Sequence, residues 1–516
     1  MHEKDIKAQV RKQLKIRYPQ WKRLTRKEKR TIARMVLAEV RKDYDLSQDI
    51  ETPLPELIGI ETQTPTAGMM DLEEMGRFIE SHKSGFLFKL RSKKRHPMYL
   101  KDKELRIIDA ILDDRFIDRL LSYDGYTPAM RKFSQSMFLR AEILKAIKYP
   151  EISYRKYCGD DKRYYGYKSN SDYFGMGNKQ NRAFIGLPLN KKQMISHVQL
   201  SQFRSSLSFA QQVNLTVYIL YHLRQKGLLD DSMIHCVDST ELATDCQQLL
   251  ATLTINGRKV RIYDDVDCDC GVRRKKRDKS PYVVGYRLHT LTAINTQTGY
   301  SIPLISLLAP ANHHDSHFLL PLVQLAKAIG LDVKLITADE AYHDNDGAVF
   351  EGNDVYLVKP PGSKASLPEN VDEETLQTMF DDQCEIPMQY LGIAAQGHEF
   401  KCNAEPGQCF RACTCPKFRH IPIDNGYFQR LLYGSEEVNK AIDIRKNGER
   451  PFNLLKKREG LEKVLVRSQR SLIAKSTFTT IATLLLEIAG TRRKMKMPES
   501  KQMSLFDEEL PRAVNY

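Results

Sequence analysis

The alternation of apolar and polar residues is clearest in the middle of the chain. Helical spacing over 210–226 leads into a short apolar run over 233–238, which predicts a buried strand. After an irregular, highly charged connection, residues 283–295 alternate as a strand does, and 301–308 alternate again after a Thr-Gly turn. We therefore expect two antiparallel strands in this region.

A second short apolar run follows a predicted helix. Residues 316–329 have an amphipathic helical pattern, Asp315 is suited to cap its N-terminus, and the apolar run 333–339 comes next. The order of strand, hairpin, helix and strand predicts an α/β fold. This order resembles the beginning of a ribonuclease-H-like nuclease.

Each of the two apolar runs ends in an acid, Asp238 in the first and Asp339 in the second. The first and fourth strands of a ribonuclease-H-like fold lie side by side, so the resemblance implies that the two carboxylates meet. A single Asp at a strand end is more often a turn former or a helix cap than a metal ligand. Two in the same architectural position favour a site for a hard cation such as Mg²⁺.

The N-terminal region is predicted to be helical and basic. Thr25 and Glu28 fit a capping box, and a helix is expected from Arg26 to about Lys42. Its apolar side carries Ile32, Met35, Val36, Leu37 and Val40. The cations expected to face solvent or phosphate are Lys22, Arg23, Arg26, Lys27, Lys29, Arg30 and Arg34. Residues 1–48 are therefore predicted to bind DNA, with an ordinary solvated basic face as the alternative.

The overall composition favours a polyanionic partner. The 516 residues contain 80 Lys and Arg against 65 Asp and Glu, and the net charge of +15 bears on partners and not on fold. Ten cysteines are too few for a disulfide scaffold, and the charged N-terminus is unlike a secretory signal, so we expect a cytoplasmic protein. The apolar segment 478–490 is too short to span a bilayer, so no membrane role is expected.

A third acid, Glu449, lies within the pattern Arg445-x₃-Glu449-x₆-Lys456. At about 100° per residue, a helix would place these three side chains on one face. With the two upstream aspartates, this spacing resembles bacterial insertion-sequence transposases of the DDE type that have a Tyr-x₂-Arg-x₃-Glu-x₆-Lys signature. Similar to them also are the run Ala338 to Tyr342 and a His-His-Asp turn before the preceding helix. The resemblance covers roughly residues 200–490.

The chain also departs from that signature. Ile442 stands where the signature has Tyr. Gly448 and Pro451 indicate a helix that begins near Glu449, which would leave Arg445 before it. Ordinary surface charge is the alternative interpretation of Arg445 and Lys456.

The resemblance implies a DNA transposase with a two-metal mechanism. Asp238, Asp339 and Glu449 would hold two Mg²⁺ ions, for which Mn²⁺ can substitute, and Arg445 and Lys456 would contact DNA. The partner would be double-stranded DNA, both the inverted-repeat ends of a transposon and the target, and a homodimer would join two ends. The alternatives are a ribonuclease-H-like nuclease or resolvase without strand transfer, and a catalytically inactive regulator, against which the three intact acids argue.

Between Asp339 and Glu449 lie 109 residues, more than one crossing connection needs, so a subdomain inserted over 345–440 is predicted. It contains Cys402, Cys409, Cys413 and Cys415, which supply enough thiolate for a structural Zn²⁺ site. The spacing lacks paired Cys-x₂-Cys knuckles, so reduced cysteines in a small insert are an equally good interpretation.

The remaining segments complete the predicted organisation. It comprises a linker over 49–70, a mostly helical or mixed region over 71–200, the first part of the core over 201–344, its last part with the Glu449 helix over 441–490, and a flexible tail over 491–516. The tail residues Gln502, Leu505 and Phe506 resemble a peptide that docks on the DNA polymerase sliding clamp, with an unstructured end as the alternative.

Three further motifs in the core region contain residues that could bind phosphate or metal ions. The basic run Arg273, Arg274, Lys275, Lys276 and Arg277 is interpreted as a phosphate contact. Asp265, Asp267 and Asp269 begin like a calcium loop but lack its glycine and closing glutamate, so we reject that motif. His313, His314 and His317 are interpreted as a polar turn before a helix, in preference to a metal site.

Overall fold

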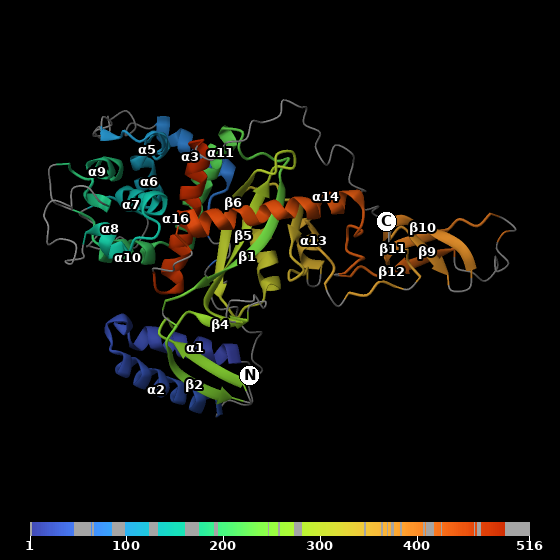
Figure 1. Cartoon of the computed structure of the whole chain (residues 1–516), viewed down its shortest axis with the longest axis horizontal. Helices are drawn as coiled ribbons and strands as arrows, with labels where there is room; N and C mark the ends of the chain where they lie inside the picture. The colour runs from blue at the N-terminus through green and yellow to red at the C-terminus, as the bar shows by residue number, and fades with distance from the viewer. Residues whose placement is uncertain are drawn as a thin grey trace.

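A six-stranded sheet runs through the middle of the chain in its computed structural model (Figure 1). The structure describes residues 3–45, 63, 67–84, 99–122, 133–159, 175–189, 194–245, 247–255, 258–272, 281–344, 347–362, 365–368, 370–372, 376–381, 384–405, 408, 417–424, 426–458, 460–461 and 466–490. Helices and strands are both abundant, so the predicted α/β class is confirmed.

The sheet follows the strand order β4-β5-β1-β7-β8, with β6 also paired to β5. Its strands are β1 (Ile234–Ala243), β4 (Asp269–Val272), β5 (Tyr282–Ile294), β6 (Ser301–Pro310), β7 (Leu335–Ala338) and β8 (Tyr356–Val358). β1 is antiparallel to β5 and parallel to β7. The predicted strands and hairpin are therefore present. β1 continues beyond Asp238 because it pairs with β5 along its whole length, so Asp238 lies within a strand and not at its end.

The helix before β7 differs from its prediction at the N-terminus. A 3₁₀ turn, η6 (Asp315–Phe318), precedes α12 (Leu319–Ala328), and the cap is His314, whose Nδ1 accepts from the Ser316 amide. Asp315 is therefore not the cap. Its carboxylate instead accepts from Arg287 at 2.7 Å, which holds the turn against β5. The predicted polar turn at the histidines is present.

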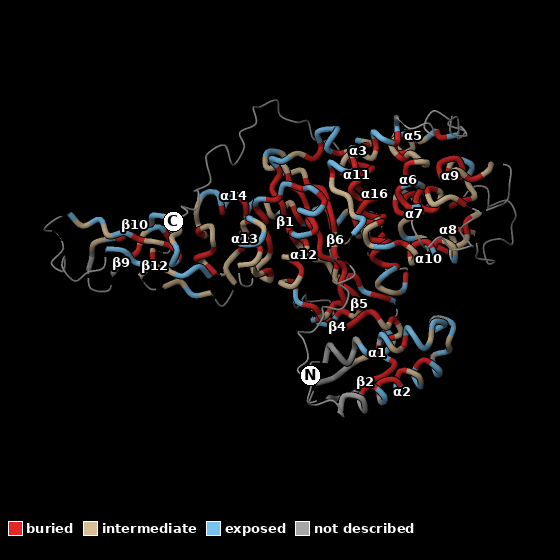
Figure 2. Tube along the Cα trace, turned by 180° about the vertical axis from the view of Figure 1, so that it is seen from behind, coloured by how far each residue is buried: buried red, intermediate tan, exposed pale blue. Residues whose placement is uncertain are grey.

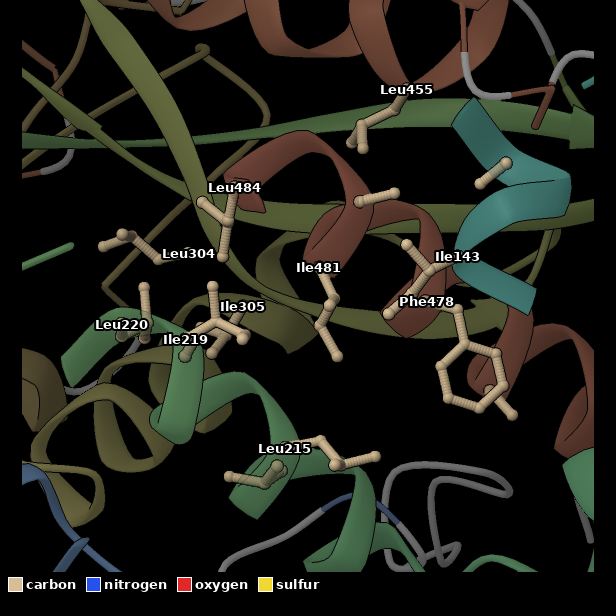
Figure 3. Close-up of a cluster of buried hydrophobic side chains, with 14 of the residues drawn as sticks. Ile143, Leu215, Ile219, Leu220, Leu304, Ile305, Leu455, Phe478, Ile481 and Leu484 are labelled. Carbon is tan, nitrogen blue, oxygen red and sulfur yellow. The ribbon is translucent and has the colours of Figure 1, made fainter. Parts of the chain in front are cut away.

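A group of helices lies beside the large sheet, and α11 (Phe209–Gln225) and α16 (Gln469–Ile488) of this group pack against β6. Its other members are α3 (Leu72–Ser84), α5 (Lys103–Ile111), α6 (Asp114–Leu120), α7 (Gln135–Lys148), α8 (Tyr154–Cys158), α9 (Lys179–Ile185) and α10 (His197–Ser206). Figure 3 shows apolar side chains of α7, α11, α16 and β6 meeting in one core, among them Ile143, Leu215, Leu304 and Ile481. Within the predicted linker 49–70, Gln63 exchanges two hydrogen bonds with the Leu308 backbone, so this residue docks on β6.

Helix α16 lies at the centre of this group of helices. It is the one helix in the described part of the chain that is long and apolar enough to cross a membrane by length and composition, but 94% of its most apolar window is buried inside the protein. Figure 2 shows this burial continuing through the strands of the large sheet. Helix α16 is therefore buried as a core helix of the protein.

The N-terminal helices pack on a hairpin from the middle of the chain. α1 (Glu3–Arg17) and α2 (Arg26–Asp45) lie with β2 (Leu249–Ile255) and β3 (Arg258–Tyr263) below the large sheet in Figure 1. Their shared core contains Val10, Leu14, Ala33, Val36, Leu37, Val40, Leu250, Ala251 and Ile262. The connection between β1 and β5, which was expected to be irregular, thus contains a hairpin whose apolar face is covered by the N-terminus.

Two side chains of α2 lie on the opposite side from their prediction. The capping box of Thr25 and Glu28 is present. Met35, predicted to be apolar core, is 53% exposed, whereas Lys29, predicted to face solvent, is buried and donates to Asp264 at 2.8 Å. The pairing with Asp264 turns Lys29 inward. It is therefore not available as a DNA contact.

The acidic segment after β3 joins three parts of the molecule. Lys15 from α1 contacts Asp267 at 2.6 Å, and Tyr286 from β5 donates to Asp265 at 2.8 Å. The backbone amides of Ser468 and Gln469, at the start of α16, donate to the same two carboxylates. These acids are occupied by protein donors, in agreement with the rejection of a calcium loop.

A second sheet lies apart from the first, at the right of Figure 1. It has the order β12-β11-β10-β9, from β9 (Thr378–Asp381), β10 (Cys384–Ala394), β11 (Gly397–Cys402) and β12 (Phe418–Ile421). Its core contains Met379, Met388, Phe400, Phe428 and Leu432. The predicted range 345–440 includes this sheet but begins too early, because α13 (Ala348–Asn353) precedes β8 and β8 pairs with β7 in the large sheet.

Candidate active site

The parallel register of β1 and β7 brings the two aspartates to neighbouring strands. His235 pairs with Ile336, and the register ends with Val237 beside Ala338. The next residues along the two strands are Asp238 and Asp339. One hundred residues of sequence separate them, but the crossover through β5, β6 and α12 returns the chain to the edge of β1.

The third acid arrives on a helical segment that crosses the sheet. α14 (Glu436–Arg445), the 3₁₀ turn η8 (Lys446–Glu449), α15 (Arg450–Asn453) and a π turn (Leu454–Arg458) follow one another without a gap. Arg445 is therefore the last residue of α14. The Gly448 and Pro451 pattern had predicted that Arg445 precedes the helix, and this prediction is wrong. Pro451 is tolerated because it lies in the first turn of α15.

Close packing at Gly448 brings Glu449 to the aspartates. A Cβ atom on Gly448 would lie 2.5 Å from Cys236 Sγ, so only glycine lets η8 approach β1 this closely. Arg450 donates to the Gly299 carbonyl in the β5–β6 turn at 3.2 Å. Glu449, between these two anchors, is held over the strand that carries Asp238.

The carboxylate of Asp238 interacts electrostatically with each of the other two acids. Burial raises the pKa of Asp238 to about 6, and repulsion from Glu449 and Asp339 adds to this, although the Ser239 amide and Arg445 oppose it. Repulsion among acids at one place is what a bound cation relieves. The sequence prediction that these three residues come together agrees with this interaction.

Two hydrogen bonds and one cation fix the aspartates. Asp238 Oδ1 accepts from the Ser239 amide at 2.7 Å, and Asp339 Oδ1 accepts from the Ala341 amide at 2.8 Å. Asp339 Oδ2 lies 4.0 Å from Nη2 of Arg445. Nε of Arg445 is buried and has no hydrogen-bond partner among the described residues, so this guanidinium retains a donor.

The other two signature positions have different surroundings. Ile442 packs against an apolar cluster that includes Ile234, Leu335 and Val438, so the place of the signature Tyr belongs to the interface between α14 and the sheet. Lys456 lies in the π turn and is partly buried. The structure thus places Arg445 beside Asp339.

A buried polar network supports the site from behind. Asp315 accepts from Arg287 and from the Ser239 hydroxyl at 3.4 Å. His289 is fully buried, stacks on Phe318 with ring centroids 3.8 Å apart, and its Nδ1 is 3.0 Å from the Tyr342 hydroxyl. Sequence reasoning missed Arg287 and His289. The sequence feature that could have revealed them is a pair of basic residues, two positions apart, in an otherwise apolar strand.

The fit to metal ions follows from the donor set. Asp238, Asp339 and Glu449 supply oxygen atoms only, which suits Mg²⁺ or Mn²⁺. In the described part of the chain no group of three or more His, Cys, Asp or Glu side chains is arranged closely enough to hold an ion as it stands. The acids fit such ions by their chemistry, and their side chains would have to rearrange to bind them.

The predicted zinc residues are only partly described. Cys402 is a free thiol in β11, whereas Cys409, Cys413 and Cys415 lie outside the described residues. The neighbouring His398 already uses both ring nitrogens, Nδ1 with the Tyr390 hydroxyl and Nε2 with the Gln429 carbonyl. His398 is therefore engaged in the core of the small sheet, and the zinc site stays a prediction.

The predicted DNA contacts fall into three groups. Arg23, Lys27, Arg30 and Arg34 are exposed along α2 and the segment before it. Lys29 is buried, as described above. Outside the described residues or side chains lie Lys22, Arg26, Arg273, Arg274, Lys275, Lys276, Arg277, Gln502, Leu505 and Phe506.

No protein-family model matches the chain, and no curated protein matches it with significant similarity. The site is therefore interpreted from its own geometry and chemistry.

Proposed function

We propose that this protein is a DNA transposase of the DDE type, with Asp238, Asp339 and Glu449 as its catalytic acids. The observation that supports this most directly is the placement of the acids: Asp238 and Asp339 come next after the paired residues of β1 and β7, and Gly448 packs the turn that carries Glu449 against β1. We further propose that the large sheet is a ribonuclease-H-like core. The antiparallel β1–β5 pair and the parallel β1–β7 pair support this topology, and β9 to β12 would be its inserted subdomain.

In this proposal the acids hold two Mg²⁺ ions, which when bound activate the attacking oxygen and stabilise the leaving oxygen of a phosphodiester. Asp238 would be the central ligand, because its carboxylate interacts electrostatically with both Asp339 and Glu449. Arg445, with its unpartnered Nε, would neutralise a phosphate that approaches Asp339. The Ser239 and Ala341 amides orient the carboxylates before any ion binds.

The same groups serve two reactions. Water as the nucleophile would cut DNA at a transposon end, and a DNA 3′-hydroxyl would join that end to a target. The exposed cations of α2 would hold the DNA through its phosphates. A location at the nucleoid and a homodimer that joins two ends complete the proposal.

The test uses a supercoiled plasmid that carries the gene with its native flanking DNA. The unaltered protein should cut at the borders of the element with Mg²⁺ or Mn²⁺, and Asp339→Asn should lose cutting while still binding DNA. The matched control is Asp332→Asn, an exposed acid before β7 that pairs with Lys334. Cutting by Asp339→Asn would overturn the assignment.

A nuclease or resolvase without strand transfer is the second candidate, because the same acids would serve hydrolysis alone. Pre-cut element ends incubated with a target plasmid separate the two. Joined products support a transposase, whereas hydrolysis without joining supports the nuclease.

A further inference from the structure

Two imidazole rings face each other in the segments that follow β6 and β7. The rings of His314 and His343 are nearly parallel, with 8° between their planes and 6.4 Å between their centroids. His343 follows Asp339 by four residues. His314 precedes Asp315, whose carboxylate accepts from Ser239, the neighbour of Asp238. The two rings therefore belong to the segments that follow β6 and β7, and each is close in sequence to a residue of the candidate site.

A buried lysine lies behind one of these rings. Thr337 pairs with Val358 in the β7–β8 register, so Lys359 is beside Ala338, one residue before Asp339. The Lys359 side chain is fully buried, and its Nζ is 3.1 Å from Nδ1 of His343. An ammonium group can only donate, so Nδ1 of His343 accepts this bond. The ring proton of His343 is then on Nε2.

The same tautomer is imposed on the second ring by the backbone. The Ser316 amide donates to Nδ1 of His314 at 3.2 Å. A backbone amide cannot accept, so the proton of a neutral His314 ring is also on Nε2. An Nε2 that carries a proton is a hydrogen-bond donor and not a metal ligand. The pair is therefore suited to bind an acceptor beside the acids.

The surroundings also keep His343 uncharged. Burial lowers the pKa of His343, and the nearby Lys359 and His314 lower it further. An uncharged N–H donor next to a carboxylate cluster suits an anionic oxygen of the group that the cluster acts on, and in DNA that oxygen belongs to a phosphodiester.

Resting on the proposed function, we infer that His343 and His314 donate from Nε2 to the oxygens of a DNA phosphate beside the scissile one. Lys359 is a positioning residue in this arrangement. It acts through His343 by fixing the ring tautomer, and it does not itself touch the DNA.

The tautomers are tested in the full-length protein labelled with ¹⁵N-histidine, by NMR of the ring nitrogens. Signals are assigned by their loss in His343→Gln and His314→Gln. Both rings should carry the proton on Nε2. In Lys359→Met, His343 should lose its single tautomer while His314 keeps its own, which shows that the fold persists. A proton on Nδ1 of His343, or an unchanged His343 signal in Lys359→Met, overturns the role of Lys359.

The phosphate contact is tested by adding a short duplex of the flanking DNA to the metal-free protein. The Nε2 signals of both rings should shift, while those of His197, on the distant helix α10, should not. The absence of a shift overturns the contact, whether or not the protein cuts DNA. Failure of the proposed function is seen separately, as an unaltered protein that does not cut.

Cutting rates at saturating DNA give a third readout. His343→Gln retains an N–H donor and should cut within about threefold of the unaltered protein, whereas His343→Leu should lose about tenfold or more, the effect of one hydrogen bond to a charged group. His197→Leu is the control and should cut normally. Equal rates for His343→Leu and the unaltered protein would contradict the inference.

Discussion

Gly448 and Cys236 are in such close contact that a methyl group on Gly448 would lie 2.5 Å from the Cys236 sulfur and 3.0 Å from its Cβ. The contact joins the turn that carries Glu449 to the strand that carries Asp238. The position of Glu449 relative to Asp238 therefore depends on the absence of a side chain at Gly448.

Gly448→Ala should push η8 away from β1. We expect a loss of about 1–3 kcal/mol in the free energy of unfolding, the usual cost of overpacking, and a larger loss of DNA cutting. The double variant Gly448→Ala, Cys236→Ala removes the opposing sulfur. It should restore part of the lost free energy of unfolding and part of the lost DNA cutting. Gly352→Ala, where an added Cβ meets nothing within 4 Å, is the control. An active Gly448→Ala protein would contradict the importance of this contact.

The raised pKa of Asp238 predicts how stability depends on pH. Its value of about 6 in the folded protein exceeds the 3.8 of the unfolded chain, so stability falls as pH rises from about 4 to about 6 and stays reduced above that. Asp238→Asn removes the ionisation, and at pH 7.5 without metal it should stabilise the protein by up to about 3 kcal/mol. At pH 4 the unaltered protein and Asp238→Asn should have nearly the same free energy of unfolding. Urea unfolding at both values of pH measures this, and a destabilised Asp238→Asn at pH 7.5 would contradict it.

Metal ions should stabilise the folded protein, whereas the ionisation of Asp238 without metal destabilises it. Mg²⁺ or Mn²⁺ that binds only the folded protein raises the unfolding temperature, by an amount that grows with its concentration. We expect this rise in the unaltered protein, and little of it in Asp238→Asn. Calorimetry with and without Mg²⁺ compares the two, with Asp332→Asn as a variant that should respond normally. An equal rise in Asp238→Asn would place the ion elsewhere.

Lys29 and Lys27, on the same helix, should respond differently to substitution. Lys29→Met leaves the carboxylate of Asp264 with Arg467 at 3.5 Å as its remaining ion-pair partner, so we expect a loss of about 2–3 kcal/mol. Lys27→Met removes an exposed charge and should change stability by less than about 0.5 kcal/mol. It should, however, reduce the salt dependence of DNA binding by about one phosphate contact. Thermal unfolding and DNA titration over a range of salt distinguish the two effects.

Glu142 should be among the most sensitive positions in the group of helices beside the large sheet. Its carboxylate pairs with Arg204 and accepts from the Tyr154 hydroxyl at 2.7 Å. Burial lowers the pKa of Lys475 to about 7, and repulsion from Lys145 and Arg204 adds to this, whereas Glu142 opposes it. Glu142→Gln should therefore cost about 3–5 kcal/mol. Adding Lys475→Met should recover part of the loss, and a double variant no more stable than Glu142→Gln would show that the charges are not coupled.

The sequence was most informative where local pattern and topology agree. Asp238 and Asp339 could be predicted to meet because each ends an apolar run, and the resemblance to a ribonuclease-H-like fold implies that the two strands lie side by side. Glu449 could be found from its spacing to Arg445. Long-range partners were not visible in this way: Lys29 is turned inward by Asp264, 235 residues later in the chain. Asp315 looked like a cap because the side chain that engages it, Arg287, lies on β5, 28 residues earlier in the chain.

Pairing explains the other differences. The polar end of β1 looks like a loop, but it is a strand because β5 supplies partners as far as Ala243. The β2–β3 hairpin is short and charged, and its apolar face is recognisable only once α1 and α2 cover it. The roles of His343 and Lys359 depend on hydrogen bonds between elements, which no periodicity in the sequence reveals.

The dependence of the first two helices on the β2–β3 hairpin sets an order of events during synthesis. α1 and α2 leave the ribosome early, but the strands that complete their core are made about 200 residues later. Until then, the apolar side of these helices lacks Leu250, Ala251 and Ile262, and the helices cannot complete their core. A fragment of the first 48 residues should therefore fold poorly by itself, and under the proposed function the protein would bind DNA firmly only after much of its central sheet has been made.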